Sequence, residues 1–349
     1  MLTIQKIQSS PCFTSSIPDE IQINTDYDSV DVDVFCGNKP IFSTTLYTYQ
    51  SNASLASLRE LIEEYMLDNN LMVSVISVNA QARQEQAETS ATVIYSSYRQ
   101  VCDIKNFLET HYLTTRTSFL IPYNGAQYLS WYQEETPGDN ECYTEVLTEA
   151  EGFKTYRIMD RVDNGQAQSE LFKPNDIFQT LLKQQPTLRD ATLETIKSIT
   201  VHRGKRSMTF YLAKETPQLM LNFRNCFNCL ETAYIYAATT LKTDIDRSEA
   251  TCNNQTTFYD QQTTHAHEVN ITTLSLEHAL WLNQLFESHK VTDPNGNHIL
   301  ISDITSEISD ETNATNKLKF TWRFSDNSLS LETPTPDKIF TEQYNPQFS

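Results

Sequence analysis

The side chains of this sequence that are best suited to chemistry are three cysteines and two histidines in its last third. Cys226 and Cys229 are separated by two residues, Cys252 follows them, and His265 and His267 form a His-x-His pair. The thiolates of two cysteines two residues apart can bind one zinc ion, and imidazole groups can complete its tetrahedral coordination. However, the spacing differs from that of the common zinc fingers, cysteine also occurs as a small buried hydrophobe, and His-x-His fits two side chains on one face of a strand. We therefore interpret these side chains as packing residues and predict no metal site. Zinc binding by these five residues stays open as the alternative.

Two groups of acidic residues have the composition of a calcium site but not its pattern. Calcium needs several oxygens that converge from one loop. Asp31 and Asp33 alternate along an expected strand, which explains them as its solvated face, and Asp26 and Asp28 precede them. The segment 293–297, Asp-Pro-Asn-Gly-Asn, has its glycine too early for a calcium loop, and no glutamate stands at the twelfth position. It is predicted to form a turn between a helix and a strand.

The small number of glycines argues against the common enzyme motifs. The chain has 7 glycines and contains no G-x-G-x-x-G, no G-x-x-x-x-G-K-[ST] and no G-x-S-x-G sequence. Phosphate cradles and the nucleophile elbow need glycine because a side chain would block the close approach or the strained turn. We therefore predict no catalytic and no cofactor-binding residues, and we expect that the protein is not an enzyme. An active site assembled from distant residues would leave no local motif, and this interpretation stays open.

The charge of the chain argues against nucleic acids and membranes as partners. Its 45 Asp and Glu residues outnumber 26 Lys and Arg residues, and the resulting net charge of -19 repels phosphate backbones and anionic lipids. The densest basic cluster, residues 202–206, lies between two apolar stretches and is expected to be a charged hairpin tip. Neither a signal peptide nor an apolar run of about 18 residues occurs, so a soluble chain without an export signal is expected. The odd, scattered set of 7 cysteines favours free thiols in a reducing cytoplasm.

Hydrophobic periodicity predicts a mainly β chain of α+β type. Period-two segments predict strands at residues 20–25, 31–36, 40–49, 71–79, 90–98, 115–122, 127–133, 141–149 and 153–159. Helices are expected near residues 54–67, capped by a residue of Asn52 to Ser54, near residues 174–184, and near residues 275–288, which begin at Ser275. The third helix is expected to turn the following side chains toward a sheet: Leu276, Ala279, Leu280, Leu282 and Phe286. These elements predict two β-sandwich-like or barrel-like domains, each with a helix packed on a sheet.

The domain boundary is expected near Thr216 and Pro217, where a proline follows a charged turn. Proline cannot donate a hydrogen bond to a central β-ladder, so it marks a connection. This boundary gives an N-terminal β-rich domain of residues 1–215 and a C-terminal sandwich-like domain of residues 216–349. Beyond residue 327, three prolines among polar residues predict an extended arm, and we expect this arm to dock on a neighbouring subunit.

The last expected strand, residues 317–324, alternates apolar and polar side chains, so one of its faces must be covered by another layer. Four motifs precede it: a Cys/Asn-rich segment at 224–229, R-S-E-A-T-C-N at 247–253, F-Y-D at 258–260, which is expected to form a turn, and I-S-D-I-T-S-E-I-S-D at 301–310. Through these motifs, the region from about residue 219 to 327 resembles structural proteins of tailed-phage and prophage tails from gut Bacteroidetes. None of the motifs is catalytic, and residues 1–215 show no such resemblance.

The resemblance implies a structural virion protein of a phage-like tail, in a distal-tail, baseplate or tail-tube-associated position. Its partners would be copies of itself, arranged as a homo-oligomeric ring, and other tail or baseplate proteins. Assembly would take place in the cytoplasm of the bacterial host, and the mature location would be the virion tail.

A carbohydrate-binding module or adhesin is the alternative. It is suggested by the strand pattern and by 17 Tyr and 3 Trp residues, since exposed aromatic rings stack on sugars. Against it, Trp131 and Trp322 occupy strand positions that are expected to point inward, and no export signal is present.

Overall fold

A computed structural model of the chain describes residues 1–7, 10–99, 103–133, 142–149, 153–159, 167–188, 191–252, 255–311 and 315–325. The helices in these ranges are α1 (Leu58–Asp68), α2 (Ile104–Thr110), α3 (Pro174–Gln184) and α4 (Leu276–Glu287). The strands are β1 (Thr3–Ile4), β2 (Cys12–Phe13), β3 (Ile21–Asn24), β4 (Ser29–Cys36), β5 (Lys39–Tyr47), β6 (Asn52–Leu55), β7 (Val73–Ala82), β8 (Glu85–Ile94), β9 (Ser118–Pro122), β10 (Gln127–Tyr132), β11 (Cys142–Thr148), β12 (Lys154–Met159), β13 (Ala167–Phe172), β14 (Ile196–Arg203), β15 (Arg206–Ala213), β16 (Leu219–Arg224), β17 (Leu230–Ile235), β18 (Thr239–Cys252), β19 (Gln255–Leu274), β20 (Val291–Thr292), β21 (His298–Glu307) and β22 (Asn316–Phe324).

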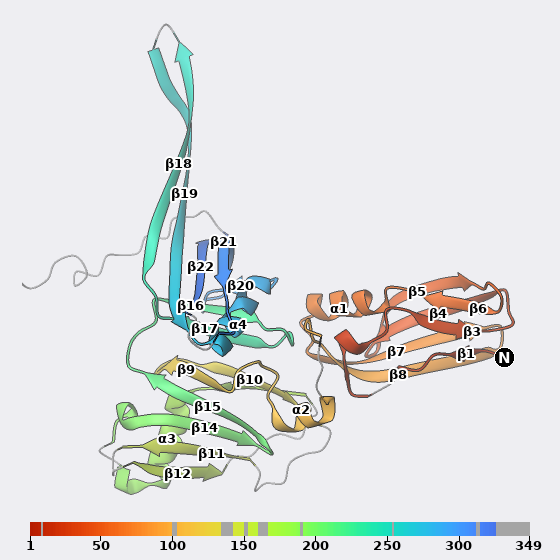
Figure 1. Ribbon diagram of the computed structural model, residues 1–349, viewed down its shortest axis with the longest axis horizontal. Helices are drawn as coiled ribbons and strands as arrows, with labels where there is room; N and C mark the ends of the chain where they lie inside the picture. The colour runs from red at the N-terminus through yellow and green to blue at the C-terminus, as the bar shows by residue number, and fades with distance from the viewer. Residues whose placement is uncertain are drawn as a thin grey trace, which may run out of the picture.

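The N-terminal part of the chain forms two sheets around a hydrophobic core of its own, which runs from Leu2 to Tyr95 (Figure 1). One sheet has the strand order β2-β8-β7-β4-β5, and the other has the order β1-β3-β6. The valines of β4 are buried and Asp31 between them is exposed, which is the alternation of a sheet with one covered face. Helix α1 adds three buried apolar side chains to the same core.

The middle of the chain forms a five-stranded sheet of order β12-β11-β14-β15-β9 and a pair of strands, β10 and β13. Neighbouring strands of the larger sheet are antiparallel, except that β15 and β9 are parallel. Phe178 and Leu181 of α3 lie in one core with Trp131 of β10 and Phe210 of β15. This core therefore lies between the five-stranded sheet, α3 and the β10–β13 pair.

The C-terminal part forms a seven-stranded sheet of order β17-β16-β20-β21-β22-β19-β18, on which α4 packs through β16, β21 and β22. Strands β18 and β19 have 14 and 20 residues and extend far beyond the other strands of this sheet (Figure 1). We call the part of this hairpin that is anchored in the sheet, residues 239–242 and 266–274, its root.

The five-stranded and seven-stranded sheets share one hydrophobic cluster, which runs from Tyr112 to Phe320. Strands β15 and β16, which flank the expected boundary at Thr216 and Pro217, nevertheless belong to different sheets. The division of the chain at this position stays a prediction, and the expected C-terminal arm lies outside the described residues. The mainly β architecture of α+β type, with helices packed on sheets, is confirmed.

Two expectations about the helices are wrong. Residues 52–54 lie in β6, and Ser57 is the N-cap residue of α1. In α4, Leu276 and Leu280 are exposed and Trp281 is buried, so the helix is rotated from the expected orientation. The rotation turns the indole of Trp281 toward the sheet, where its N–H group donates to the buried carboxylate of Glu231. The sequence also does not predict α2, because its seven residues are too few to show a helical period.

The basic cluster at residues 202–206 forms the expected charged tip of the hairpin between β14 and β15, and Lys205 in its turn is exposed. Arg203 and Arg206 are both buried. Arg203 pairs with Glu170 at 2.8 Å, and Arg206 donates hydrogen bonds to backbone carbonyls of α2 and β10. These guanidinium groups therefore tie the hairpin to its neighbours, which the local charge pattern does not reveal.

The turn between β16 and β17 joins the N-terminal sheets to the rest of the protein. Phe227 in this turn packs against Phe13 of β2, with ring centroids 5.9 Å apart. Asn228 is buried, has a φ of 56° and donates from its side-chain nitrogen to the carbonyls of Met66 and Leu71, each at 3.0 Å. The amide thus ties the turn to the end of α1, where the carbonyl of Met66 also accepts from the backbone N–H of Leu71.

We predict that Asn228→Ala lowers the free energy of unfolding by about 2–3 kcal/mol, since it removes two buried hydrogen bonds and leaves alanine in a left-handed conformation. Asn228→Gly removes the same hydrogen bonds but tolerates the positive φ, so it should lose about 1 kcal/mol less. Equilibrium unfolding in urea measures both values. Equal stability of the two variants and the parent protein would show that the turn does not secure this junction.

Candidate functional site

The cysteines and histidines with the spacing of a metal site belong to different parts of the structure. Cys226 and Cys229 are buried in the junction described above, where burial raises the pKa of Cys229 to about 12 and its Sγ lies 3.8 Å from Met72 Sδ. His265 and His267 lie in β19. Cys252 ends β18, and its side chain lies outside the described residues. Within the described ranges, no group of three or more His, Cys, Asp or Glu side chains is placed to hold a metal ion.

The most unusual feature of the molecule is the hairpin of β18 and β19. Strand β19 pairs with β22 from Leu274 up to His267, which lies opposite Trp322. Beyond that point β18 and β19 pair only with each other among the described strands (Figure 1). We call this part, residues 243–252 and 255–265, the projecting ribbon. Its described side chains are exposed or half-buried.

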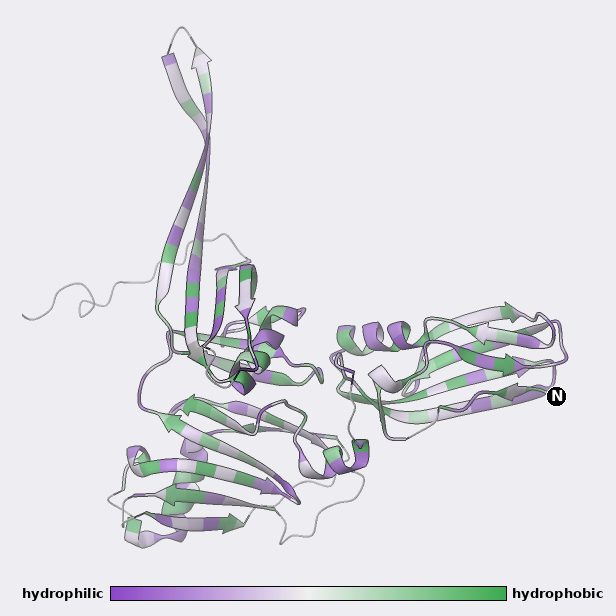
Figure 2. Cartoon of the chain, in the orientation of Figure 1, coloured by the Kyte–Doolittle hydropathy of each residue, from purple (hydrophilic) through white to green (hydrophobic). Residues whose placement is uncertain are grey.

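The two faces of the projecting ribbon differ in character. Residues that pair across an antiparallel ribbon share a face, and successive residues alternate between faces. Pairing therefore places Ile245 and Phe258 on one face, in line with Leu241 at the root. Arg247, between them, and Glu249, opposite Phe258, lie on the same face. The opposite face carries acidic side chains, including Asp244 and Asp246. Hydrophobic and hydrophilic residues accordingly follow each other along the ribbon in Figure 2.

The apolar face of the ribbon continues the face of the seven-stranded sheet that packs under α4. At the root, Val269 lies opposite Phe320, which is buried beneath Phe286 of α4 with ring centroids 5.3 Å apart. Two residues toward the ribbon, the ring of His267 stacks on half-buried Trp322 at 4.5 Å. The next apolar positions are uncovered, since Leu241 is 57% exposed and Ile245, on the ribbon itself, is 45% exposed. The sheet face is thus longer than the layer that covers it.

The aromatic residues near the outer end of the ribbon lie in a β-bulge. Ser248 pairs with Asp260 and Glu249 pairs with Phe258, so Tyr259 has no partner across the ribbon. The expectation that residues 258–260 form a turn is therefore wrong, because all three lie inside β19. A bulge redirects side chains locally. Phe258 and Tyr259 are 57% and 70% exposed.

A buried carboxylate fixes α4 over the sheet at the root of the ribbon. Glu231 of β17 accepts hydrogen bonds from Trp281 Nε1 and, at 2.6 Å, from Asn225 Nδ2. Burial raises the pKa of Glu231 to about 7, and the nearby charge of Arg116 opposes this rise. Because the carboxylate is enclosed by these partners and only 2% exposed, it serves packing better than catalysis.

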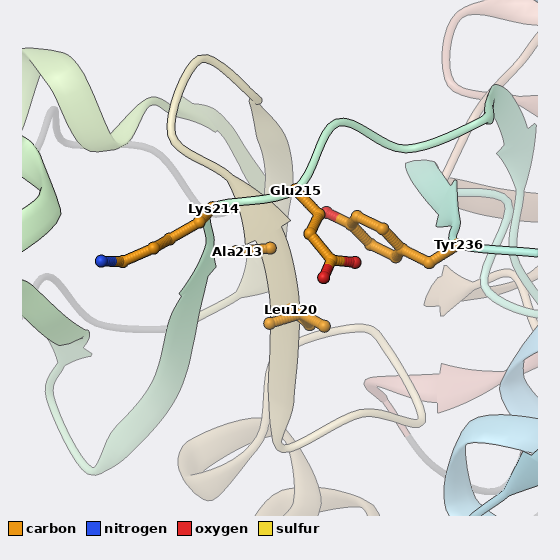
Figure 3. A pocket seen from close by; sticks show the side chains of 5 residues that line it. All are labelled: Leu120, Ala213, Lys214, Glu215 and Tyr236. Atoms are coloured by element: carbon orange, nitrogen blue, oxygen red, sulfur yellow. The ribbon is translucent and has the colours of Figure 1, made fainter.

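A shallow pocket of about 350 Å³ lies where the five-stranded sheet passes into the seven-stranded sheet (Figure 3). Leu120 of β9, Ala213 at the end of β15 and Tyr236 after β17 line it, together with Lys214 and Glu215 of the connecting segment. Lys214 extends away from the pocket, whereas the carboxylate of Glu215 lies between Leu120 and Tyr236 in Figure 3.

Comparisons with known proteins do not assign this chain to a family. No protein-family model matches the sequence, and no curated protein matches it. A crystal structure of titin domains Z1Z2 in complex with telethonin is 11% identical, over 56% of this chain and 87% of that chain, with a TM-score of 0.15. The titin I-band fragment I67–I69 is 9% identical, over 88% of this chain and 83% of that chain, with a TM-score of 0.16. Scores this low carry no argument about fold or function.

Helices able to cross a membrane are absent from the described parts of the chain, because none is both long and apolar enough.

The buried carboxyl of Glu231 makes stability depend on pH. Its pKa is about 7 in the folded protein and 4.5 ordinarily, so the folded state binds the proton first and stability rises as the pH falls below about 8. The gain between about pH 8 and pH 6.5 should be about 1 kcal/mol, and Glu231→Gln should abolish it. Below pH 6.5 His278 acts in the opposite sense, because burial lowers its pKa to about 4.

Urea unfolding of the parent protein and of Glu231→Gln, at both pH values, measures this effect as a difference between the two proteins. The contribution of His278 is common to both and cancels. A difference in unfolding free energy that does not change with pH would contradict the titration of Glu231 in this range.

Proposed function

We propose that this protein is a structural subunit of a phage-like tail, in a distal-tail, baseplate or tube-associated position. It acts by assembling into a ring with copies of itself and by binding other tail or baseplate proteins, without catalysis. Assembly takes place in the cytoplasm of the bacterial host, and the mature location is the virion tail. The observation that carries the assembly role is the projecting ribbon, and the motif resemblance of residues 219–327 supports its setting in a tail.

The backbone of the ribbon favours association. A two-stranded hairpin in water is marginally stable by itself, and three or more strands or a covering layer are normally needed. The outer edges of β18 and of residues 255–265 in β19 have no neighbouring strand among those described. Unpaired edges present backbone N–H and C=O groups that can pair with another chain, and monomeric proteins usually protect them.

The side chains of the ribbon favour association as well. Complete burial of a side chain such as those of Ile245 and Phe258 contributes about 1.5–3 kcal/mol. Both side chains lie on the apolar face, and a partner that covered this face would extend the layer that α4 begins at the root. Asp244 and Asp246 would stay on the opposite, solvated face. The ribbon thus has one face suited to an interface and one suited to water.

The alternative function, a carbohydrate-binding module or adhesin, has less support. Trp131 and Trp281 are 1% and 3% exposed, and Trp322 is half-buried with its ring stacked on His267. None of the three tryptophans therefore offers the open ring face on which a sugar stacks.

Removal of the ribbon tests the assembly function. Thr243 pairs with His265, so residues 244–264 can be replaced by Asn-Gly, a dipeptide that joins antiparallel strands in a two-residue turn. We expect the parent protein to form oligomers with masses that are multiples of 40.1 kDa and the shortened protein to be a folded monomer. Size-exclusion chromatography with light scattering measures both masses.

A double variant of the acidic face, Asp244→Asn with Asp246→Asn, is the matched control, because it changes the ribbon but leaves the apolar face intact. It should assemble at least as well as the parent protein, since it lowers the repulsion between acidic chains. A parent protein that stays monomeric at all concentrations, or a shortened protein that assembles like the parent, would contradict the proposal.

A further inference from the structure

Resting on the assembly function proposed above, we infer that the aromatic end of the projecting ribbon docks into the Leu120–Ala213–Tyr236 pocket of a second copy of this chain. Phe258 packs on the apolar lining of the pocket, and Arg247 pairs with Glu215, which lies between Leu120 and Tyr236. The interface is heterologous, which means that different surfaces of the two copies meet, as in the rings of homo-oligomers.

The pocket has the size and lining that an aromatic side chain needs. Its volume of about 350 Å³ exceeds that of one aromatic ring, and its walls are apolar at Leu120, Ala213 and the ring of Tyr236. Leu120 is 48% exposed, and neighbouring Tyr211, which lies opposite Leu120 in the sheet, is 51% exposed. Leu120 and Tyr211 thus form an exposed apolar patch of the five-stranded sheet at the edge of the pocket.

The hydroxyl group of Tyr236 is a second sign that this surface is incomplete. The oxygen is buried but has no hydrogen-bond partner within the described residues. A buried hydroxyl without a partner is costly, so native structures rarely leave one unsatisfied. A group of a docked chain that reaches the pocket can satisfy it.

One basic side chain at the outer end of the ribbon, Arg247, is suited to meet Glu215, and it lies among four acidic side chains: Asp244, Asp246, Glu249 and Asp260. The guanidinium carbon of Arg247 lies 5.1 Å from the centroid of the Phe258 ring. A surface that binds the Phe258 ring is therefore also close to this positive charge. Glu215, whose carboxylate lies between Leu120 and Tyr236 in Figure 3, provides the matching group and takes part in no ion pair within the described ranges. Lys214 is already engaged, with its Nζ 3.7 Å from Glu194. An acidic chain that must bind itself needs such local pairing to offset its overall repulsion.

The ribbon reaches a neighbouring copy rather than its own pocket. Phe258 lies opposite Glu249, ten residues along β18 from the root at Thr239, which corresponds to about 33 Å at the rise of a strand. The pocket is lined by β9, the end of β15 and the segments next to β15 and β17, whereas the ribbon extends away from both sheets (Figure 1). In the structure the aromatic end of the ribbon points away from the rest of its own chain, so we place the contact between two copies (Figure 1).

Substitutions on both sides of the interface test this inference by the concentration at which assembly is half complete. Phe258→Ser should weaken assembly at least about tenfold, as expected for the loss of a central aromatic anchor. The matched control is Phe153→Ser, because Phe153 is 68% exposed and lies outside the ribbon and the pocket. The midpoint of urea unfolding should stay unchanged in both variants, since both side chains are exposed.

Charge reversal identifies the pairing of residues. Arg247→Glu and Glu215→Arg should each weaken assembly about tenfold, and a chain that carries both changes should recover most of the loss, because the ion pair is restored with reversed polarity. Absence of recovery in the double variant, or no effect of either single change, would overturn the inference.

The outcomes separate this inference from the function on which it rests. If the Asn-Gly replacement of the ribbon abolishes assembly but Phe258→Ser and the charge reversals do not, the ribbon docks elsewhere, for example edge to edge with another ribbon, and the inference is wrong while the proposed function stands. If the ribbon replacement also leaves assembly unchanged, both fail.

Discussion

A two-stranded ribbon has two edges and two faces, and the described part of this chain covers none of them along the outer half of β18 and β19. In a globular domain, apolar strand residues are stabilised by a second layer and backbone groups by neighbouring strands. Here Ile245 and Phe258 have no second layer among the described elements. The proposed contacts with another chain would supply the missing layer, and the rest of the structure can be understood as the support of the ribbon.

The support consists of rigid connections between neighbouring elements. Helix α4 covers the sheet at the root of the ribbon, and the buried Glu231 holds Trp281 of this helix against β17. At the N-terminal end of β17, the turn that contains Asn228 binds the end of α1 in the N-terminal part of the chain. The root of the ribbon is thus linked through β16 and β17 to both other parts of the protein. A firmly anchored ribbon loses less conformational entropy when it binds than a mobile one would.

Much of this architecture follows from local sequence patterns, and the part that does not follow is the part that matters for function. The alternation in β4, the proline at the start of α3 and the cap at Ser275 are local signals, and the elements appear where they predict them. The ribbon also alternates, but a period of two tells only which residues share a face and not whether another layer covers it. The bulge at Tyr259 and the burial of Arg206 depend on partners distant in sequence, so no local pattern reveals them. For the same reason Cys226 and His265, which are compatible with a metal site by spacing, lie in separate elements.

The central claim is that the projecting ribbon becomes covered when copies of the chain meet. Amide hydrogen exchange as a function of protein concentration tests it most directly, with β14 as the internal reference because this strand is central to its sheet. The account predicts that amides of residues 243–252 and 255–265 exchange rapidly in dilute protein and become protected as the concentration rises, while protection of β14 stays constant. If ribbon amides exchange at the same rate in the dilute and the assembled protein, the ribbon is not the assembly element and the account is wrong.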